Sequence, residues 1–196
     1  MSLIRLRRNL GVLMISMGLA ACSSTLKTAE LDPETGRFDT ASEVEPEEIL
    51  VDEALAVQEY KRLLVARSEI SDPRWQTFFR DSLENMGYFE RVLDEDQLEQ
   101  FVVTNGYANQ VENISDLVGL HNLAGAYGKF LICEIEARRL YGYHFESELR
   151  VFDPVSGKLV FHVKRAAFNW SGLDDPLFYP VMNAFHDWLR RNEDST

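Results

Sequence analysis

The feature that most constrains the fold is a two-residue hydrophobic alternation near the C-terminal end of this 196-residue chain. Three segments carry it: "KFLICEIEARRL" (129–140), "YHFESELRVFD" (143–153) and "KLVFHVKRAAFNW" (158–170). Successive side chains of a strand point to opposite faces of its sheet, so each segment has one face suited to a core and one suited to water. "DPVSG" joins the last two segments and has the proline and glycine of a tight hairpin. The pattern predicts a meander of three antiparallel strands.

Helical signals alternate with shorter strand signals before this meander. A compact apolar run, Leu63–Ala66, predicts a buried strand. Asp72 and Pro73 are typical of a helix start, and Asp94 with Gln97 three residues later is a variant of the capping box. The predicted elements are a strand (60–70), a helix (71–86), a short strand (89–93), two helices (94–105 and 114–128), the three-stranded meander and a C-terminal helix (179–192).

This order, β-α-β-α-α-β-β-β-α, predicts an α/β fold. Helices combined with a partly antiparallel meander favour a two-layer sandwich. We therefore expect a mixed sheet with its helices on one face, and the other face in water.

The N-terminal segment has the three parts of a signal peptide. A positive region with three arginines precedes an apolar core of about ten residues, too short to span a bilayer, and "LAAC" ends at Cys22. A buried hydrophobic helix with an incidental cysteine is the alternative. We expect residues 1–21 to be a signal peptide, 22–50 a lipid anchor with a flexible acidic tether, and 51–196 a single domain. For the acidic segment, irregular chain packed on the domain is the alternative.

"LAAC" resembles the lipobox of bacterial lipoproteins. The resemblance implies cleavage before Cys22, diacylglycerol on its thiol and an acylated (palmitate-type) N-terminus. In that family an Asp after the cysteine favours the inner membrane. Ser23 stands there in this chain, which implies an outer-membrane lipoprotein that faces the periplasm.

A second resemblance covers residues 61–192. "GAYGKFLICEIEA" followed by "LRVFDPVSGKLVF" and a terminal helix is similar to a domain of several envelope proteins. These are TolB N-terminal regions, the curli secretion channel lipoprotein, the exopolysaccharide-export lipoprotein of the Pel system and outer-membrane activators of penicillin-binding proteins. The resemblance implies a lipid-anchored periplasmic domain that belongs to an oligomer or an envelope complex.

Composition limits the possible partners and chemistry. The formal net charge of −12 disfavours binding to nucleic-acid phosphates. If Cys22 carries lipid, Cys133 has no disulfide partner within the chain, and we interpret it as a small buried residue. Neither a "GxSxG" nucleophile motif nor a phosphate-binding loop is present, and no cofactor is expected.

One polar cluster could serve as a metal or acid–base site. His144 lies on a predicted strand beside Glu146 and Glu148, with Glu134 and Glu136 on the neighbouring strand. Alternation alone also places acids on the water face of a sheet, and this solvated face is the preferred interpretation, with no metal site assigned.

Aromatic residues gather near strand ends and before the last helix. They form either the rim of the core or a partner-binding patch, for which the candidates are Phe168, Trp170, Phe178 and Tyr179. We expect a non-enzymatic, lipid-anchored envelope protein that acts as an accessory, scaffold or assembly factor, with envelope proteins or further copies of itself as partners. The alternatives are a periplasmic metal-dependent enzyme that uses the His144/Glu face and an oligomeric secretion-channel component.

Overall fold

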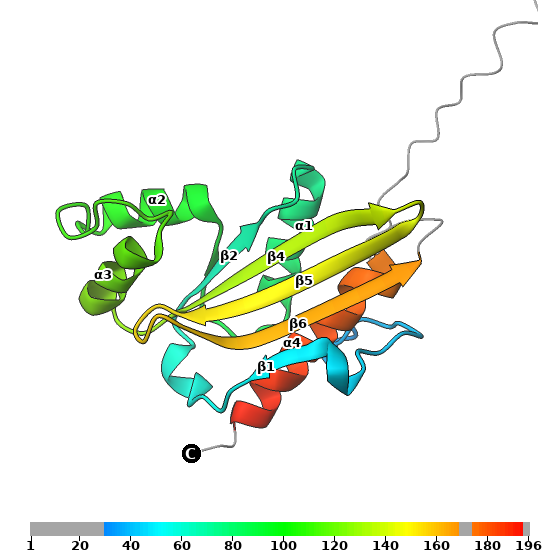
Figure 1. Ribbon diagram of the computed structural model, residues 1–196. Coiled ribbons are helices and arrows are strands. Elements are labelled where there is room, and N and C mark those ends of the chain that lie inside the picture. The colour runs from blue at the N-terminus through cyan, green and yellow to red at the C-terminus, as the bar shows by residue number, and fades with distance from the viewer. Residues whose placement is uncertain (1–29, 169–173, 194–196) are drawn as a thin grey trace, which may run out of the picture.

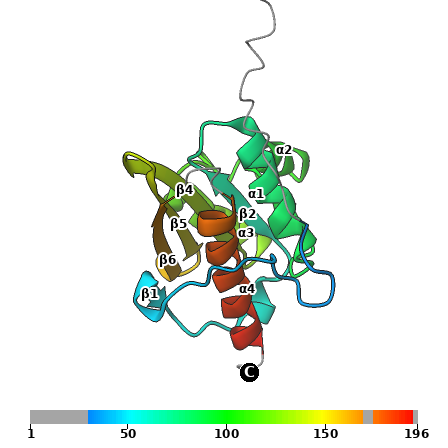
Figure 2. The ribbon, with the colours of Figure 1, turned by 90° about the vertical axis from the view of Figure 1, so that its right-hand side faces the viewer.

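A computed structural model describes residues 30–168 and 174–193 (Figures 1 and 2). Its elements are η1 (Pro46–Glu48), β1 (Ile49–Asp52), η2 (Val57–Tyr60), β2 (Leu64–Ser68), α1 (Pro73–Asn85), β3 (Val92–Leu93), α2 (Glu95–Thr104), α3 (Leu117–Tyr127), β4 (Leu131–Tyr141), β5 (His144–Asp153), β6 (Lys158–Phe168), the π-helical turn η3 (Asp174–Phe178) and α4 (Tyr179–Glu193).

The strands form one mixed sheet of six strands in the order β1-β6-β5-β4-β2-β3. β4, β5, β6 and β1 pair antiparallel, whereas β2 runs parallel to both β4 and β3. The predicted meander and α/β class are confirmed. β1 was not predicted; it extends the sheet beyond β6.

Local sequence signals fix the predicted helix starts. Asp72 accepts a hydrogen bond from the backbone N–H of Arg74, and Pro73 is the first residue of α1. Asp94 and Gln97 form the reciprocal capping box of α2, with bonds of 2.9 and 3.1 Å. α4 begins at Tyr179, so Pro180 lies in its first turn, where its missing N–H costs nothing.

The helices cover both faces of the sheet, so the expectation of helices on one face needs correction. α1 and α4 lie side by side behind the sheet in Figure 1 and bury the larger core, which includes Leu64, Cys133 and Ile135. A second core contains Val65 and Ile132, which point to the opposite face, together with side chains of α2 and α3. The uninterrupted apolar runs at the starts of β2 and β4 reflect this burial on both faces.

The predicted tether also needs correction. From Leu31 onward the described chain packs on the domain, and Phe38 is only 4% exposed. β1 pairs with β6, which places residues 49 and 50 inside the folded unit rather than before it. The alternative of irregular chain packed on the domain is what the structure has. The physical reason is apolar packing: Phe38 is buried against Tyr179 and Asn183 of α4, and Leu31 and Val44 pack against the same core.

Some predictions concern residues that the structure does not describe. Cys22, the signal peptide and Trp170 lie outside the described residues. Within the described ranges, every helix is too short or too polar to pass through a lipid bilayer.

Candidate functional site

The β4–β5 hairpin ends in a tight turn at one end of the sheet. Gly142 occupies this turn with φ of +50°, a conformation that favours glycine. Its carbonyl accepts a 2.6 Å hydrogen bond from Nε of Arg139, and Tyr141 pairs with His144 across the strands. The turn therefore holds the flanking aromatic residues in a defined register.

Aromatic and aliphatic side chains gather on this turn and on the neighbouring end of β6. The His144 ring stacks on Tyr141, with centroids 4.5 Å apart, and meets Phe168 edge-on at 5.4 Å. Tyr143 contacts the same phenylalanine at 6.3 Å. We call this set the tip cluster: Leu140, Tyr141, Tyr143, His144 and Phe168.

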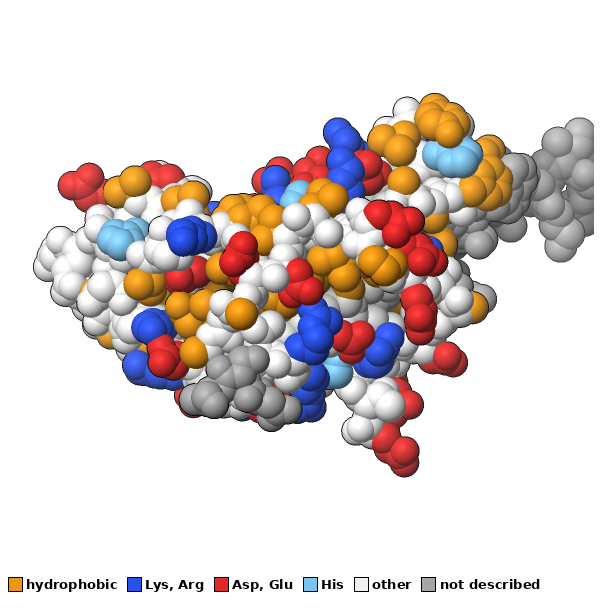
Figure 3. Space-filling view, turned by 60° about the horizontal axis from the view of Figure 1, so that its bottom comes forward, with side chains coloured by type: hydrophobic (Ala, Val, Ile, Leu, Met, Phe, Trp, Pro, Cys, Tyr) orange, Lys and Arg blue, Asp and Glu red, His pale blue; other side chains and the backbone are white. Residues whose placement is uncertain are grey.

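The tip cluster is unusually exposed for its composition. Tyr141 is 67% and Phe168 57% exposed. Hydrophobic side chains and a histidine gather at this projecting end, in the upper right of Figure 3. Exposed apolar side chains that lie together, rather than singly, are typical of a binding surface.

The structure brings only part of the predicted patch to this surface. Phe168 belongs to the tip cluster, whereas Phe178 and Tyr179 are 2% and 4% exposed. The Phe178 ring stacks on Trp75 of α1 at 4.5 Å, and the Tyr179 ring stacks on Phe38 at 4.4 Å. These two residues lie at the junction of η3 and α4, on the side that faces α1, and they fill the core. Of the predicted patch residues that the structure describes, Phe168 alone is exposed.

The acidic face of the sheet is paired with bases. Glu148 contacts His162 at 2.8 Å, and Glu146 accepts a 2.6 Å bond from Arg138 and lies 3.2 Å from the Lys164 ammonium. Further contacts of 3.5 Å join Glu134 to Arg67 and to Arg150.

His144 stands apart from these acids because its ring stacks on Tyr141 at the hairpin end. Across residues 30–168 and 174–193, no three His, Cys, Asp or Glu side chains are arranged to hold a metal ion. Burial also raises the pKa of the Cys133 thiol, which disfavours a reactive thiolate. The arrangement fits a charge-balanced face whose acid side chains, Glu134, Glu146 and Glu148, are only 11–18% exposed.

Comparison with known proteins finds distant likenesses in solved structures. No family model matches the chain, and no curated protein matches it. The LpoB C-terminal domain of Salmonella enterica is 14% identical with a TM-score of 0.40; the match covers 58% of this chain and 90% of that one. A PelC dodecamer structure from Paraburkholderia phytofirmans is 12% identical with a TM-score of 0.37, covering 74% and 91%. Lipoprotein GNA1162 of Neisseria meningitidis is 16% identical with a TM-score of 0.35, covering 69% and 98%.

The chain thus resembles structures that include a bacterial lipoprotein, in line with the resemblance drawn from its sequence. With TM-scores below 0.5, these likenesses carry no argument about function.

Proposed function

We propose that this protein is a lipid-anchored, non-enzymatic component of the cell envelope that binds another envelope protein through the tip cluster. Cys22 carries the lipid, and the domain faces the periplasm from the outer membrane. The observation that carries the binding role is the exposed set of stacked aromatic rings at the end of the β4–β5 hairpin.

The chemistry of the tip cluster favours a protein partner. Tyrosine, phenylalanine and arginine are enriched at the centres of protein interfaces, where large rings bury area at low entropic cost. Arg139 flanks the cluster, whereas the chain as a whole has a net charge of −12. A partner surface with an apolar centre and an acidic rim would complement this end of the molecule and be repelled by most of the remainder.

The paired acids of the sheet support the non-enzymatic part of the proposal. A general base or metal ligand needs a free lone pair directed into a site. Here the carboxylates of Glu146 and Glu148 are engaged by Arg138, Lys164 and His162 on the same face.

The lipid anchor can be tested by labelling cells with an alkyne fatty acid. We expect label on the wild-type protein and on Ser23→Ala, the matched control beside the attachment site, and none on Cys22→Ser. Label retained by Cys22→Ser, or absent from the wild type, would contradict the anchor.

The docking surface can be tested with a photo-crosslinking amino acid placed at Tyr141 in intact cells. The same probe at Val118, which is 70% exposed on α3, is the control. We expect a discrete protein adduct at 141 that disappears when Phe168→Ala is added, and none at 118. Adducts with lipid alone, or a protein adduct unaffected by Phe168→Ala, would overturn this role for the tip cluster.

A further inference from the structure

The first described part of the chain forms a small closed turn on the outside of the domain. Leu31 pairs with Phe38 in an isolated antiparallel bridge, and the Asp32 carboxylate accepts a 2.7 Å hydrogen bond from the Glu34 backbone N–H. Figure 2 shows this segment crossing α4 in blue. We call residues 31–38 the clasp.

One ring and one side-chain amide fix the clasp to the domain. The Phe38 ring stacks on Tyr179 and also contacts Phe78 of α1, 5.9 Å away. The amide of Asn183 on α4 accepts from the Phe38 N–H at 2.8 Å and donates to the Phe38 carbonyl at 2.9 Å. The Asn183 side chain therefore satisfies both backbone hydrogen-bonding groups of Phe38, as a neighbouring strand would.

Leu31 packs, partly buried, against the larger core, and the other contacts of the clasp are near the solvent. Arg37 and Asp187 form an ion pair of 3.0 Å whose side chains are both 37% exposed, and such pairs contribute little to stability. Phe38 is the one buried residue of the clasp. The clasp is therefore held mainly at Phe38, with Leu31 as a lesser apolar contact.

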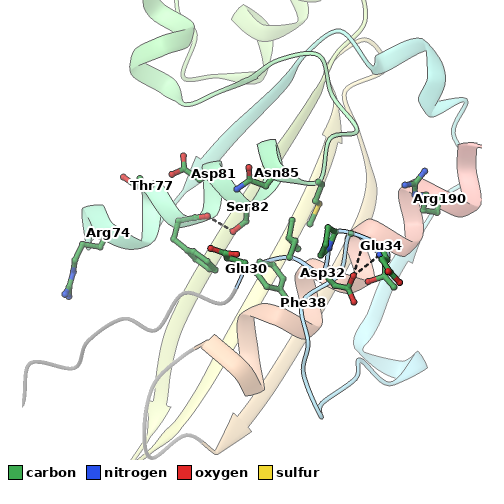
Figure 4. Close-up of a pocket in the computed structure, with 16 residues that line it drawn as sticks. Glu30, Asp32, Glu34, Phe38, Arg74, Thr77, Asp81, Ser82, Asn85 and Arg190 are labelled. Carbon is green, nitrogen blue, oxygen red and sulfur yellow. Dashed lines mark hydrogen bonds between the residues drawn. The ribbon is translucent and has the colours of Figure 1, made fainter.

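A cavity of about 730 Å³ separates the turn of the clasp from α1. Figure 4 shows Asp32 and Glu34 on the clasp side and Thr77, Asp81 and Asn85 along α1. Both walls carry carboxylates, and the two cations of the lining, Arg74 and Arg190, are paired with Asp72 and Glu193. Charge therefore gives the turn little attraction to α1. The turn rests on α4, and α1 does not cover it.

From this geometry we propose that the clasp opens and closes on α4 and thereby sets how far the domain stands from Cys22. The distance to a membrane rests on the proposed lipid anchor; the opening itself does not. Opening releases the conformational entropy of the freed residues, at the loss of one buried ring, the partly buried Leu31 and a few polar contacts. It is therefore a local event, separable from unfolding of the sheet.

Chain length gives the size of the effect. When the clasp is closed, nine residue steps join Cys22 to Leu31, a reach of at most about 30 Å. Beyond the clasp, the carbonyl of Glu43 accepts a hydrogen bond from Arg165 at 2.7 Å. When the clasp is open, 21 steps separate Cys22 from Glu43, a reach of about 70 Å. Opening as far as Glu43 thus more than doubles the longest span between Cys22 and the domain, which widens the region in which the tip cluster can meet a partner.

Asn183→Ala is the variant that tests opening of the clasp. It removes both bonds to Phe38 and places a good helix former in α4. Asn192→Ala is the matched control, because Asn192 lies on the same helix and also bonds main chain, namely the Leu55 N–H at 2.9 Å and the Trp188 carbonyl.

Hydrogen exchange of the mature full-length chain measures opening without any membrane. We expect amides of residues 31–38 to exchange at least tenfold faster than those of β4 and β5 in the wild type. A further increase of about tenfold in Asn183→Ala, and none in Asn192→Ala, follows from the loss of two hydrogen bonds. Clasp exchange as slow as that of the sheet, or no selective effect of Asn183→Ala, would overturn the proposal.

Energy transfer from a dye on Val118→Cys to a dye in the lipid bilayer measures the distance. We expect Asn183→Ala to lower the transfer relative to the wild type and Asn192→Ala. Faster exchange with unchanged transfer would overturn the distance-setting role. If the protein carries no lipid, only the energy-transfer measurement fails, and the hydrogen-exchange result is unaffected. The two measurements therefore distinguish a wrong anchor from a clasp that does not open.

Discussion

Glu193, the last residue of α4, accepts a 2.8 Å hydrogen bond from the ammonium of Lys61, which follows η2. Arg190 and Gln58 donate to the same carboxylate. This contact joins the end of α4 to the segment that leads into β2, 132 residues earlier in the chain.

The bonds from Lys61, Arg190 and Gln58 lower the pKa of Glu193 from 4.5 to about 2. A carboxyl group with a depressed folded-state pKa stabilises the fold above its unfolded pKa, and this contribution is lost as the pH falls from 4.5 towards 2. We expect Glu193→Gln to lower the free energy of unfolding by about 1 kcal/mol at pH 7 and by much less at pH 2–3.

Urea unfolding at several pH values measures this difference. Glu99→Gln, which removes one exposed acid from α2, controls for the loss of a charge. A Glu193→Gln deficit of the same size at pH 7 and pH 2.5 would contradict the assigned pKa shift.

The parts of the fold that were predicted are those with local signals. The meander follows from alternation within each strand. α1 and α2 begin directly after Asp72 and Asp94, because these side chains cap the first backbone N–H groups of the helices. Burial on both faces was not predicted, although the run Leu63–Ala66 lacks the polar alternation that a one-sided sheet would require.

The parts that were missed depend on contacts between distant residues. β1 is only four residues long and lies after an acidic stretch, so its pairing with β6 has no local signature. Phe38 is one aromatic residue among polar neighbours, and its partner Asn183 is 145 residues away. In the tip cluster, alternation predicted that Phe168 lies near a strand end. The exposure of its neighbours was missed, because it depends on how far the β4–β5 hairpin extends beyond the helices.

The acidic face of the sheet predicts how the protein responds to metal ions. Because Glu148 and Glu146 already contact His162, Arg138 and Lys164, a metal ion would have to displace these bases. We expect millimolar Zn²⁺, Ca²⁺ or Mn²⁺ to leave the melting temperature of the soluble domain unchanged. A stabilising shift that Glu148→Gln removes would contradict this and favour a metal site.

Ser147 joins β5 to the turn that precedes α4. Its hydroxyl is fully buried and donates a 3.1 Å hydrogen bond to the carbonyl of Leu177 in η3. Ser147→Ala leaves that carbonyl without this donor, and we expect a loss of about 1–2 kcal/mol in urea unfolding.

Ser82→Ala is the control for this change. Ser82 is also buried, but its hydroxyl donates to the Phe78 carbonyl within its own helix, and alanine improves the helix propensity there. We expect little change in its stability. Equal losses in the two variants would show that the bond between β5 and η3 has no special role.

Two glycines of α3 provide the sharpest test of packing. A Cβ at Gly119 would lie 1.5 Å from the carbonyl oxygen of Asn113, a backbone atom. The Asp116 carboxylate also caps α3 at the Gly119 N–H, 2.7 Å away. Gly119→Ala therefore forces the loop off the helix, and we expect a loss of about 3 kcal/mol.

At Gly125, in the same helix, a Cβ would meet no atom within 4 Å. Alanine has less conformational freedom to lose in a helix, so Gly125→Ala should stabilise the protein by about 0.5–1 kcal/mol. The two variants make the same chemical change in one helix and are expected to shift the urea midpoint in opposite directions. If Gly119→Ala were as stable as Gly125→Ala, the close approach of the 113–116 loop to α3 would be wrong, and with it the way α3 closes the second core.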